Sequence, residues 1–104
     1  MKDFPHIIVL SDEVFEYLTF DNKEFIHFAS IDDNFHKTIS VFSGGKLFCC
    51  NGWKVGWAIA PEFFMKAVAL IINGLVYSTN HPAQIAMSKS LDKINAKGYL
   101  GNEN

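Results

Sequence analysis

The segment HIIVL (residues 6–10) constrains the fold more than any other part of the sequence. It is short and rich in β-branched residues, and the polar residues Ser-Asp-Glu follow it directly. A short, continuously apolar run of this kind is typical of a strand that is buried on both faces, as in a parallel sheet. The sequence therefore predicts a buried first strand with polar side chains, Asp12 among them, at its carboxyl end.

Later segments complete the pattern of an α/β protein. We expect a helical turn or a loop at 13–20, a connection with one short helix at 21–35, and strands at 37–43 and 53–60. Pro61 suits the first turn of a helix, which we extend through residue 78. A second helix is expected from near Pro82 to Gly98, a residue that commonly ends helices. The prediction is one domain over residues 1–104, with a partial mixed sheet and helices.

The composition indicates that apolar faces of this chain are covered by further protein. Hydrophobic residues make up 49% of the 104 residues, charged residues only 19%, and ten residues are Phe. The helix after Pro61 carries apolar residues on almost every face, which predicts burial against a sheet or a partner chain. Apolar faces of this size are typical of interaction surfaces.

Several classes of function do not fit the sequence. The net charge is −2 and there is no basic run, so we expect no nucleic-acid partner. The longest apolar stretch, at 67–77, is interrupted by Asn-Gly and is too short to span a bilayer, so we expect no membrane partner. The four histidines lack the spacing of a metal site, so no metal is expected.

The cysteines and the N-terminal segment indicate in which cellular compartment the protein is expected. Cys49 and Cys50 are sequence neighbours and the chain has no third cysteine, so both are expected to be reduced thiols. The N-terminal segment has acidic residues on both sides of its apolar run and no small-residue cleavage site, so we expect no signal peptide there. We therefore expect a cytoplasmic protein, with a mitochondrial location as the alternative.

Lys46 follows two glycines in SVFSGGKLFCCNGWKVGW (40–57) and admits three interpretations. A phosphate-binding loop of the nucleotide-hydrolase type needs Gly at position 40 and Ser or Thr at position 47, where this chain has Ser40 and Leu47. That interpretation fails. A solvated lysine in a glycine turn remains the plain alternative to a reactive amine.

Three other residues favour the reactive amine. Asp12 and Lys46 follow the first and second predicted strands, and ligands of open α/β sheets bind at the carboxyl ends of strands. Ser43 and Lys54 add a hydroxyl group and a second cation close to Lys46. A carboxylate, an amine, a hydroxyl and a further cation are the groups that a pyridoxal-phosphate site requires, for the ring nitrogen, the aldehyde and the phosphate.

The segments SDEVFEYL and SGGKLFCCNGWKVGW resemble the class I and II aminotransferases of fold type I. They are most similar to the kynurenine aminotransferase and cysteine-conjugate β-lyase branch, and the likeness runs from about residue 6 to about residue 91. The resemblance implies that pyridoxal 5'-phosphate is the cofactor and that Lys46 is the Schiff-base lysine. It also implies that Asp12 binds the pyridinium nitrogen and that Ser43 and Lys54 bind the phosphate.

The sequence departs from the family pattern in two ways. Phe15 stands where the family usually has a tyrosine that donates a hydrogen bond to the cofactor's ring oxygen. The chain also lacks the other phosphate-binding glycine segment, the aromatic residue that stacks on the ring, the Asn-Pro segment and the arginine that binds the substrate carboxylate. The resemblance therefore implies a fragment, the middle of the large cofactor-binding domain, and we expect the isolated chain to be inactive.

The activity implied by the resemblance is transfer of an amino group from an amino acid to a 2-oxo acid, with kynurenine and other aromatic amino acids as the suggested donors. The full-length family is expected to form homodimers. Two alternatives stay open at this point. One is a catalytically silent remnant or interaction fragment that does not bind the cofactor productively, and the other is a small binding domain unrelated to pyridoxal phosphate.

Overall fold

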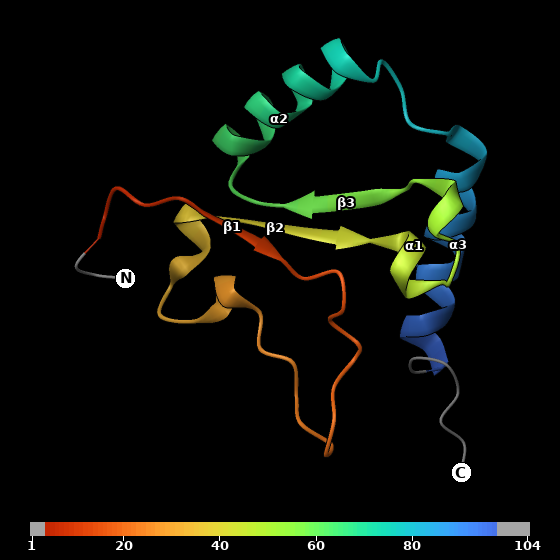
Figure 1. Cartoon of the computed structure of the whole chain (residues 1–104), viewed down its shortest axis with the longest axis horizontal. Coiled ribbons are helices and arrows are strands. Elements are labelled where there is room, and N and C mark those ends of the chain that lie inside the picture. The colour runs from red at the N-terminus through yellow and green to blue at the C-terminus, as the bar shows by residue number, and fades with distance from the viewer. Residues whose placement is uncertain (1–3, 98–104) are drawn as a thin grey trace.

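A three-stranded mixed sheet forms the centre of the structure (Figure 1). The computed structural model describes the backbone of residues 4–97 and the side chains of residues 4–94. In the order β1-β2-β3, the first two strands are parallel and the last two antiparallel. The predicted fold class, a partial mixed sheet with helices, is confirmed. The strands are β1 (Val9–Asp12), β2 (Thr38–Ser43) and β3 (Gly56–Ile59).

The strand predictions are right in number and differ in extent. The second strand matches within one residue, whereas β1 begins at Val9 and runs on to Asp12. Pairing with β2 determines this shift, because the register joins Val9 to Thr38 and Asp12 to Val41. β3 is shorter than predicted because Trp53 belongs to a 3-10 helix, η3 (Asn51–Trp53), and not to the strand.

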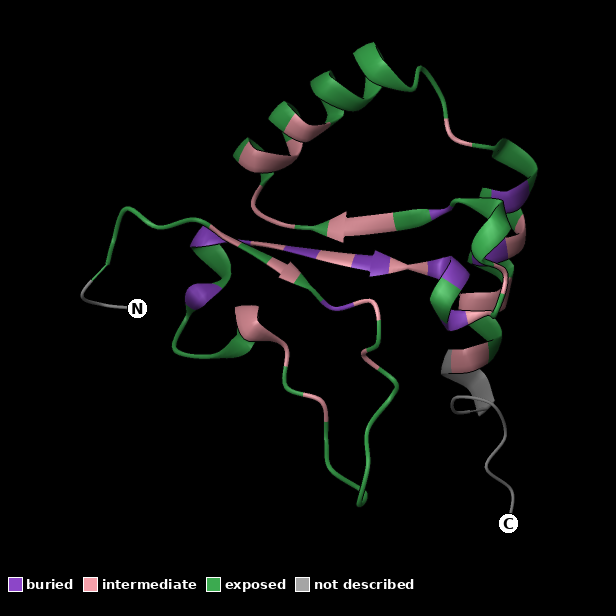
Figure 2. Cartoon of the chain, in the orientation of Figure 1, coloured by how far each residue is buried: buried purple, intermediate pink, exposed green. Residues whose placement is uncertain are grey.

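The prediction that the first strand is buried on both faces is wrong for this chain. Along β1, half-buried residues alternate with exposed ones, and Leu10 is 69% exposed. Within the described residues, β1 lies at the edge of the sheet, with β2 as its neighbour (Figure 2). β2 is the better covered strand, since every second residue from Thr38 to Phe42 is buried.

Three α-helices accompany the sheet in the part of the chain that the structure describes. α1 (Gly44–Leu47) is a single turn that directly follows β2, where the sequence predicted only a glycine turn. α2 (Glu62–Leu75) and α3 (His81–Lys97) confirm the two predicted helices. α2 ends earlier than predicted, because the backbone of Tyr77 is left-handed, with φ of 64°. The predicted stop at Gly98 lies outside the described residues.

α3 packs across one end of the sheet, beside α1 (Figure 1). Asn80, the residue before the helix, caps its N-terminus, because the Asn80 Oδ1 accepts a hydrogen bond from the Ala83 N–H at 3.0 Å. Ala83 and Met87 are buried against Val55, and Phe48 and Cys50 join this cluster. The small core therefore lies at the same end of the sheet as α1 and holds that turn in place.

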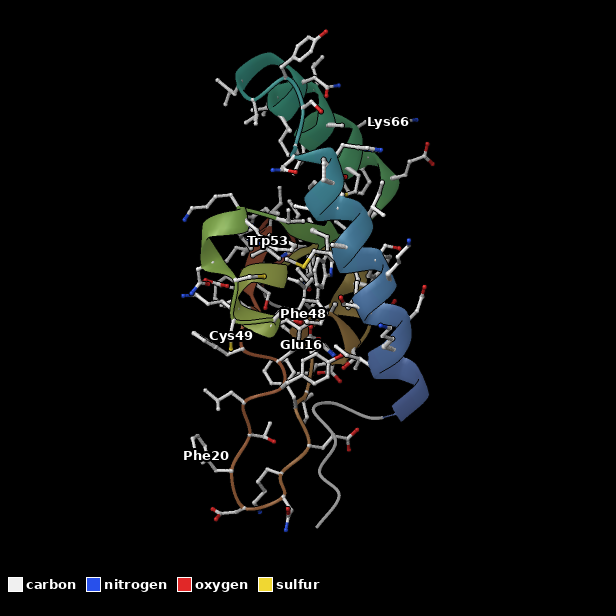
Figure 3. The ribbon with its side chains drawn as sticks, turned by 90° about the vertical axis from the view of Figure 1, so that its right-hand side faces the viewer. Glu16, Phe20, Phe48, Cys49, Trp53 and Lys66 are labelled. Atoms are coloured by element: carbon white, nitrogen blue, oxygen red, sulfur yellow. The ribbon has the colours of Figure 1, made fainter. Side chains whose placement is uncertain are left out.

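α2 lies apart from this core. None of its residues is buried, and Figure 3 shows Lys66 on α2 and Phe20 in the loop after β1 at opposite ends of the molecule. Of the two predicted partners for this apolar helix, the sheet of the described residues does not bury it, and burial against a partner chain stays a prediction. Its exposed apolar side chains are Phe63, Leu70, Ile71, Ile72 and Leu75.

Candidate cofactor-binding site

Lys46 is displayed on a turn whose other residues are fixed. The Ser43 hydroxyl oxygen accepts a hydrogen bond from the Lys46 backbone N–H at 3.2 Å, so Ser43 caps α1. Gly44, Gly45 and Leu47 are buried, whereas Lys46 is exposed. A Cβ atom at Gly45 would lie 2.9 Å from the Asn51 Cα, so the close packing of α1 on η3 requires glycine here. This packing leaves the lysine side chain facing outward.

A hollow of about 420 Å³ adjoins Lys46 and brings three predicted residues together. Ser43, Lys46 and Lys54 all line it. The backbone of Lys54 is left-handed, with φ of 54°, because this residue ends η3 and turns the chain into β3. Two ammonium groups and a hydroxyl around one hollow are suited to a phosphate dianion. The remaining lining residues are Gly45, Asn51, Val55 and Gly56.

Phe15 lies against the same lysine from another side. The Lys46 Nζ is 5.8 Å from the centroid of the Phe15 ring, within the range of a cation–π contact. These two residues also share a smaller hollow of about 220 Å³, lined in addition by Val14, Tyr17, Leu18 and Leu47. Lys46 therefore belongs to both hollows, with the phenyl ring in one and the second cation in the other.

Asp12 is placed beside this group by the parallel pairing of β1 with β2. It pairs with Val41, so its side chain and that of Ser43 lie on the same face of the sheet at the carboxyl ends of adjacent strands. Asp12 is exposed and lines neither hollow. Its Oδ1 accepts a long hydrogen bond of 3.4 Å from the Val14 N–H. The structure thus brings three predicted residues, Phe15, Ser43 and Lys54, together around Lys46 and puts Asp12 at the adjoining strand end.

The sequence analysis missed a buried carboxylate next to Asp12. Glu13 is 3% exposed, and its Oε1 accepts hydrogen bonds from the Ser11 hydroxyl at 2.9 Å and the Phe28 N–H at 3.1 Å. The Ser40 hydroxyl lies 3.4 Å from the same oxygen. The His27 Nδ1 lies 2.5 Å from the Glu13 Oε2. A signal was present in the sequence, because residues next to each other at a strand end face opposite sides of the sheet.

The surroundings shift the pKa values of two glutamates in opposite directions. Burial acts to raise the pKa of Glu13, but hydrogen bonds from His27, Ser11 and the Phe28 N–H outweigh it and hold the pKa below the ordinary 4.5. Burial raises the pKa of Glu16 and the charge of Glu13 adds to that effect, while His27 opposes it. His27 stands between these carboxylates, with its Nε2 3.9 Å from the Glu16 Oε2.

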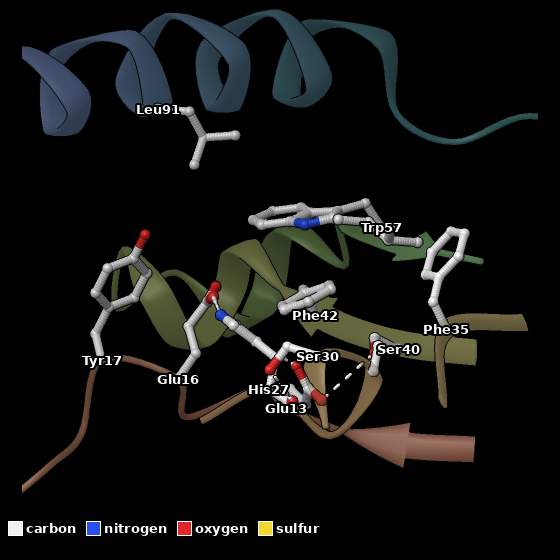
Figure 4. A pocket seen from close by; sticks show the side chains of 12 residues that line it. Glu13, Glu16, Tyr17, His27, Ser30, Phe35, Ser40, Phe42, Trp57 and Leu91 are labelled. Atoms are coloured by element: carbon white, nitrogen blue, oxygen red, sulfur yellow. Dashed lines mark hydrogen bonds and ion pairs between the residues drawn. The ribbon is translucent and has the colours of Figure 1, made fainter. Parts of the chain in front are cut away.

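A larger hollow, of about 520 Å³, lies on the Glu13 side of the sheet (Figure 4). The stacked rings of Phe42 and Trp57, with centroids 6.0 Å apart, form one wall, and Leu91 of α3 faces them from above. None of the five residues predicted to bind the cofactor lines this hollow. Although this hollow is larger than the two beside Lys46, it is not the site that the sequence predicts.

Acidification is expected to destabilise the fold through Glu13. Because the folded pKa is lowered, the contribution of Glu13 to stability is present above pH 4.5 and is lost as the pH falls through the folded value. Glu16 acts in the opposite sense, and its contribution is lost as the pH rises through its raised pKa. Urea unfolding, monitored by tryptophan fluorescence between pH 3 and pH 6 (about the range of carboxyl titration), measures how the free energy of unfolding changes with pH.

The control for this pH dependence is Glu13→Gln, which removes the titrating group. The variant should lose about 1–3 kcal/mol of stability at pH 6, the usual worth of hydrogen bonds to a charged group. Its stability should then change less with pH than that of the parent chain. Parallel curves for the two proteins would contradict the assignment of the acid sensitivity to Glu13.

Residues 4–97 contain no group of three or more His, Cys, Asp or Glu side chains that could hold a metal ion. No helix in the same range is both long and apolar enough to cross a membrane.

Comparison with known proteins identifies the family. The profile of aminotransferase class I and II matches residues 2–100. The kynurenine–oxoglutarate transaminase of Dictyostelium discoideum is 39% identical over 99 residues, which are 95% of this chain and 23% of that protein. Solved structures agree: N-succinyldiaminopimelate aminotransferase of Mycobacterium tuberculosis superposes with a TM-score of 0.80 and 36% identity over 86% of this chain and 23% of that one.

A third relative has a different activity. YbdL from Escherichia coli, with a methionine aminotransferase function, superposes with a TM-score of 0.78 and 31% identity over 83% of this chain and 23% of that one. The fold is that of an α/β protein, and its candidate site presents the Lys46 amine just beyond the carboxyl end of β2. The chain belongs to the class I and II aminotransferases, of fold type I. It spans about a quarter of the length of the relatives that it matches.

Proposed function

We propose that this chain carries the cofactor-anchoring part of a pyridoxal-phosphate-dependent aminotransferase. The observation that carries the proposal is the convergence of Phe15, Ser43 and Lys54 on Lys46, at the carboxyl end of β2. The membership of the family supports the same activity. When bound, pyridoxal phosphate supplies an electron-accepting ring that stabilises negative charge at the α-carbon of an amino acid.

The residues around Lys46 suit the parts of this cofactor. The Lys46 amine would condense with the aldehyde carbon, whose oxygen leaves as water. Once the amino group of a substrate takes its place, the freed Nζ would move a proton at the substrate α-carbon. The ammonium of Lys54 and the hydroxyl of Ser43 would hold the phosphate in the hollow that they share with Lys46. Asp12 would keep the ring nitrogen protonated from the adjoining strand end. The phenyl ring of Phe15 has no hydroxyl to donate to the ring oxygen, so that oxygen loses one partner.

The substrates and the complete enzyme are further parts of the proposal. We propose an amino acid and a 2-oxo acid as substrates, with aromatic donors of the kynurenine type, on the support of the relative from Dictyostelium. This chain contains no arginine, so an arginine that binds the substrate carboxylate would come from other parts of the active assembly. The exposed apolar side chains of α2 support a homodimer as that assembly, and the free thiols of Cys49 and Cys50 support a cytoplasmic location.

Reductive trapping tests the proposal directly. The purified chain is mixed with pyridoxal phosphate, reduced with borohydride, digested and mapped by mass spectrometry. The chain has nine lysines. We expect the phosphopyridoxyl group on Lys46 in preference to the other eight. A label spread evenly over the lysines, at the rate of a free amine, would contradict the proposed site.

Lys54 is expected to contribute to phosphate binding through its charge. Lys54→Ala should weaken the binding of pyridoxal phosphate by about fivefold, the equivalent of about 1 kcal/mol for an exposed ion pair. Lys54→Arg should retain the affinity, since guanidinium binds phosphate well. Absorbance titration measures both variants. Alanine and arginine meet the same left-handed backbone, so equal affinities for the two would rule out a role for the charge.

A further inference from the structure

Glu13 stands between two residues of the proposed site but faces away from them. In the sequence, Asp12 precedes it and Phe15 follows two positions later. Asp12 shares the sheet face of Ser43, whereas the Glu13 carboxylate meets Ser11 and Ser40 on the opposite face. Any displacement of Glu13 therefore moves the backbone that carries both neighbours.

Glu13 is fixed by contacts from several segments. Its backbone N–H donates to the Val41 carbonyl oxygen at 3.0 Å, which continues the pairing with β2, and its own carbonyl accepts from the Glu16 N–H at 3.1 Å. Its carboxylate reaches Ser40 on β2 and the His27 and Phe28 pair, which follows the exposed loop. The turn at 13–16 is thus tied by one side chain to β2 and to the far end of the loop that follows it.

His27 connects this side chain to the sheet. Its ring lies edge-on to Phe25 and Phe42, with centroids 5.1 Å and 6.1 Å apart. The loop between the turn and His27 has no helix or strand, and its residues Leu18, Phe20 and Ile26 are exposed. Without the contact between His27 and Glu13, that loop would contribute little to holding the turn.

We propose that Glu13, held by His27, is a positioning residue for the cofactor site, because it fixes the turn that places Phe15 beside Lys46 and follows Asp12 at the adjoining strand end. The carboxylate does not touch the cofactor and acts through the backbone on either side of it. A glutamate in a solvent-exposed turn needs no partner from the protein, whereas Glu13 is buried and its carboxylate has four hydrogen-bond donors. The inference rests on the proposed function for the roles of Asp12 and Phe15, and on geometry alone for the placement of the turn.

The test compares two substitutions of His27 in the whole chain. His27→Leu removes the donor to Glu13, whereas His27→Asn keeps an N–H close to the position of Nδ1. NMR spectroscopy of the cofactor-free chain reports the turn through the ring-current shift of the Lys46 ε-methylene protons, which arises from Phe15. Contacts between Val41 and Ala58 report the sheet independently. His6→Leu, at an exposed histidine before β1, is the matched control.

We expect His27→Leu to lose the ring-current shift while the contacts between β2 and β3 remain, and His27→Asn and His6→Leu to keep both. Glu13→Met should show the same loss, and if that variant does not fold, the pair of His27 variants still decides. The rate of reductive trapping at Lys46 should fall about tenfold in His27→Leu and recover in His27→Asn.

Two results would overturn the inference. In one, His27→Leu retains the ring-current shift and the trapping rate of the parent chain. In the other, the shift disappears only together with the contacts between β2 and β3, which would mean a purely structural role. If the parent chain itself is not labelled at Lys46, the proposed function fails, and the NMR comparison still decides whether Glu13 positions the turn.

Discussion

Lys46→Ala is expected to abolish the covalent attachment of pyridoxal phosphate to this chain. The reaction requires an amine that can approach the aldehyde while the phosphate is held, and Lys46 is the residue common to the hollow that holds Ser43 and Lys54 and to the hollow that holds Phe15. Lys54 is the other amine in the larger of these two hollows. Because its backbone is fixed beyond η3, we expect it to bind phosphate and not the aldehyde.

The measurement is the visible absorbance of the bound cofactor, followed by borohydride reduction and mass spectrometry. Lys66→Ala is the matched control, since Lys66 lies on α2 and pairs only with Glu62, at 2.8 Å, among the ion pairs of the described residues. The control should be labelled like the parent chain. Labelling of Lys46→Ala at more than about a tenth of the parent rate, a difference of 1.4 kcal/mol, would show that another amine binds the cofactor.

The second large effect is expected at Gly56, where β3 meets the end of β2. A Cβ atom at this position would lie 2.6 Å from the Phe42 carbonyl oxygen, and backbone atoms cannot move aside as a flexible side chain can. Gly56→Ala should therefore lower the free energy of unfolding by at least about 1–3 kcal/mol, as overpacking does. It should also disturb the phosphate hollow, which Gly56 lines.

Urea denaturation of Gly56→Ala and Gly52→Ala provides the comparison. A Cβ atom at Gly52 has no neighbour within 4 Å, so that substitution should change the stability by less than about 0.5 kcal/mol. Gly74→Ala, on the exposed side of α2, also meets no atom within 4 Å and should stabilise the helix by roughly 0.5–1 kcal/mol. Similar stabilities for Gly56→Ala and Gly52→Ala would contradict the close approach at Phe42.

The sequence predicted those elements of the fold that depend on local patterns. The strand predicted at 37–43, which ends before two glycines, coincides with β2 within one residue, and prolines located the starts of α2 and α3. The extents of β1 and β3 could not be read in this way, because hydrogen bonds to β2 determine them. α1 was missed for a similar reason, since the packing of Gly45 on Asn51 shapes that turn and sequence spacing does not reveal it.

The candidate site shows the same division. Lys46, Ser43 and Lys54 are close in sequence, so their spacing and the resemblance of their segment identified them together. Asp12 required the parallel pairing of β1 with β2. The sequence suggested a parallel sheet because the first strand was expected to be buried on both faces, and the structure has the parallel pairing without that burial. The link from Glu13 to His27 joins residues across an irregular loop, and no periodic pattern in the sequence predicts such a contact.

The open edge of β1 has a practical consequence for work with this chain. A strand whose outer backbone groups face solvent, with Leu10 exposed, is a template on which another strand can add. We therefore expect aggregation of the purified chain to rise steeply with concentration, at micromolar levels and above. Leu10→Lys would act as a gatekeeper and extend the concentration range in which spectra can be recorded. Leu10 lines neither of the two hollows beside Lys46, but it shares the sheet face of Asp12, so the variant serves spectroscopy of the fold and not measurements of cofactor binding.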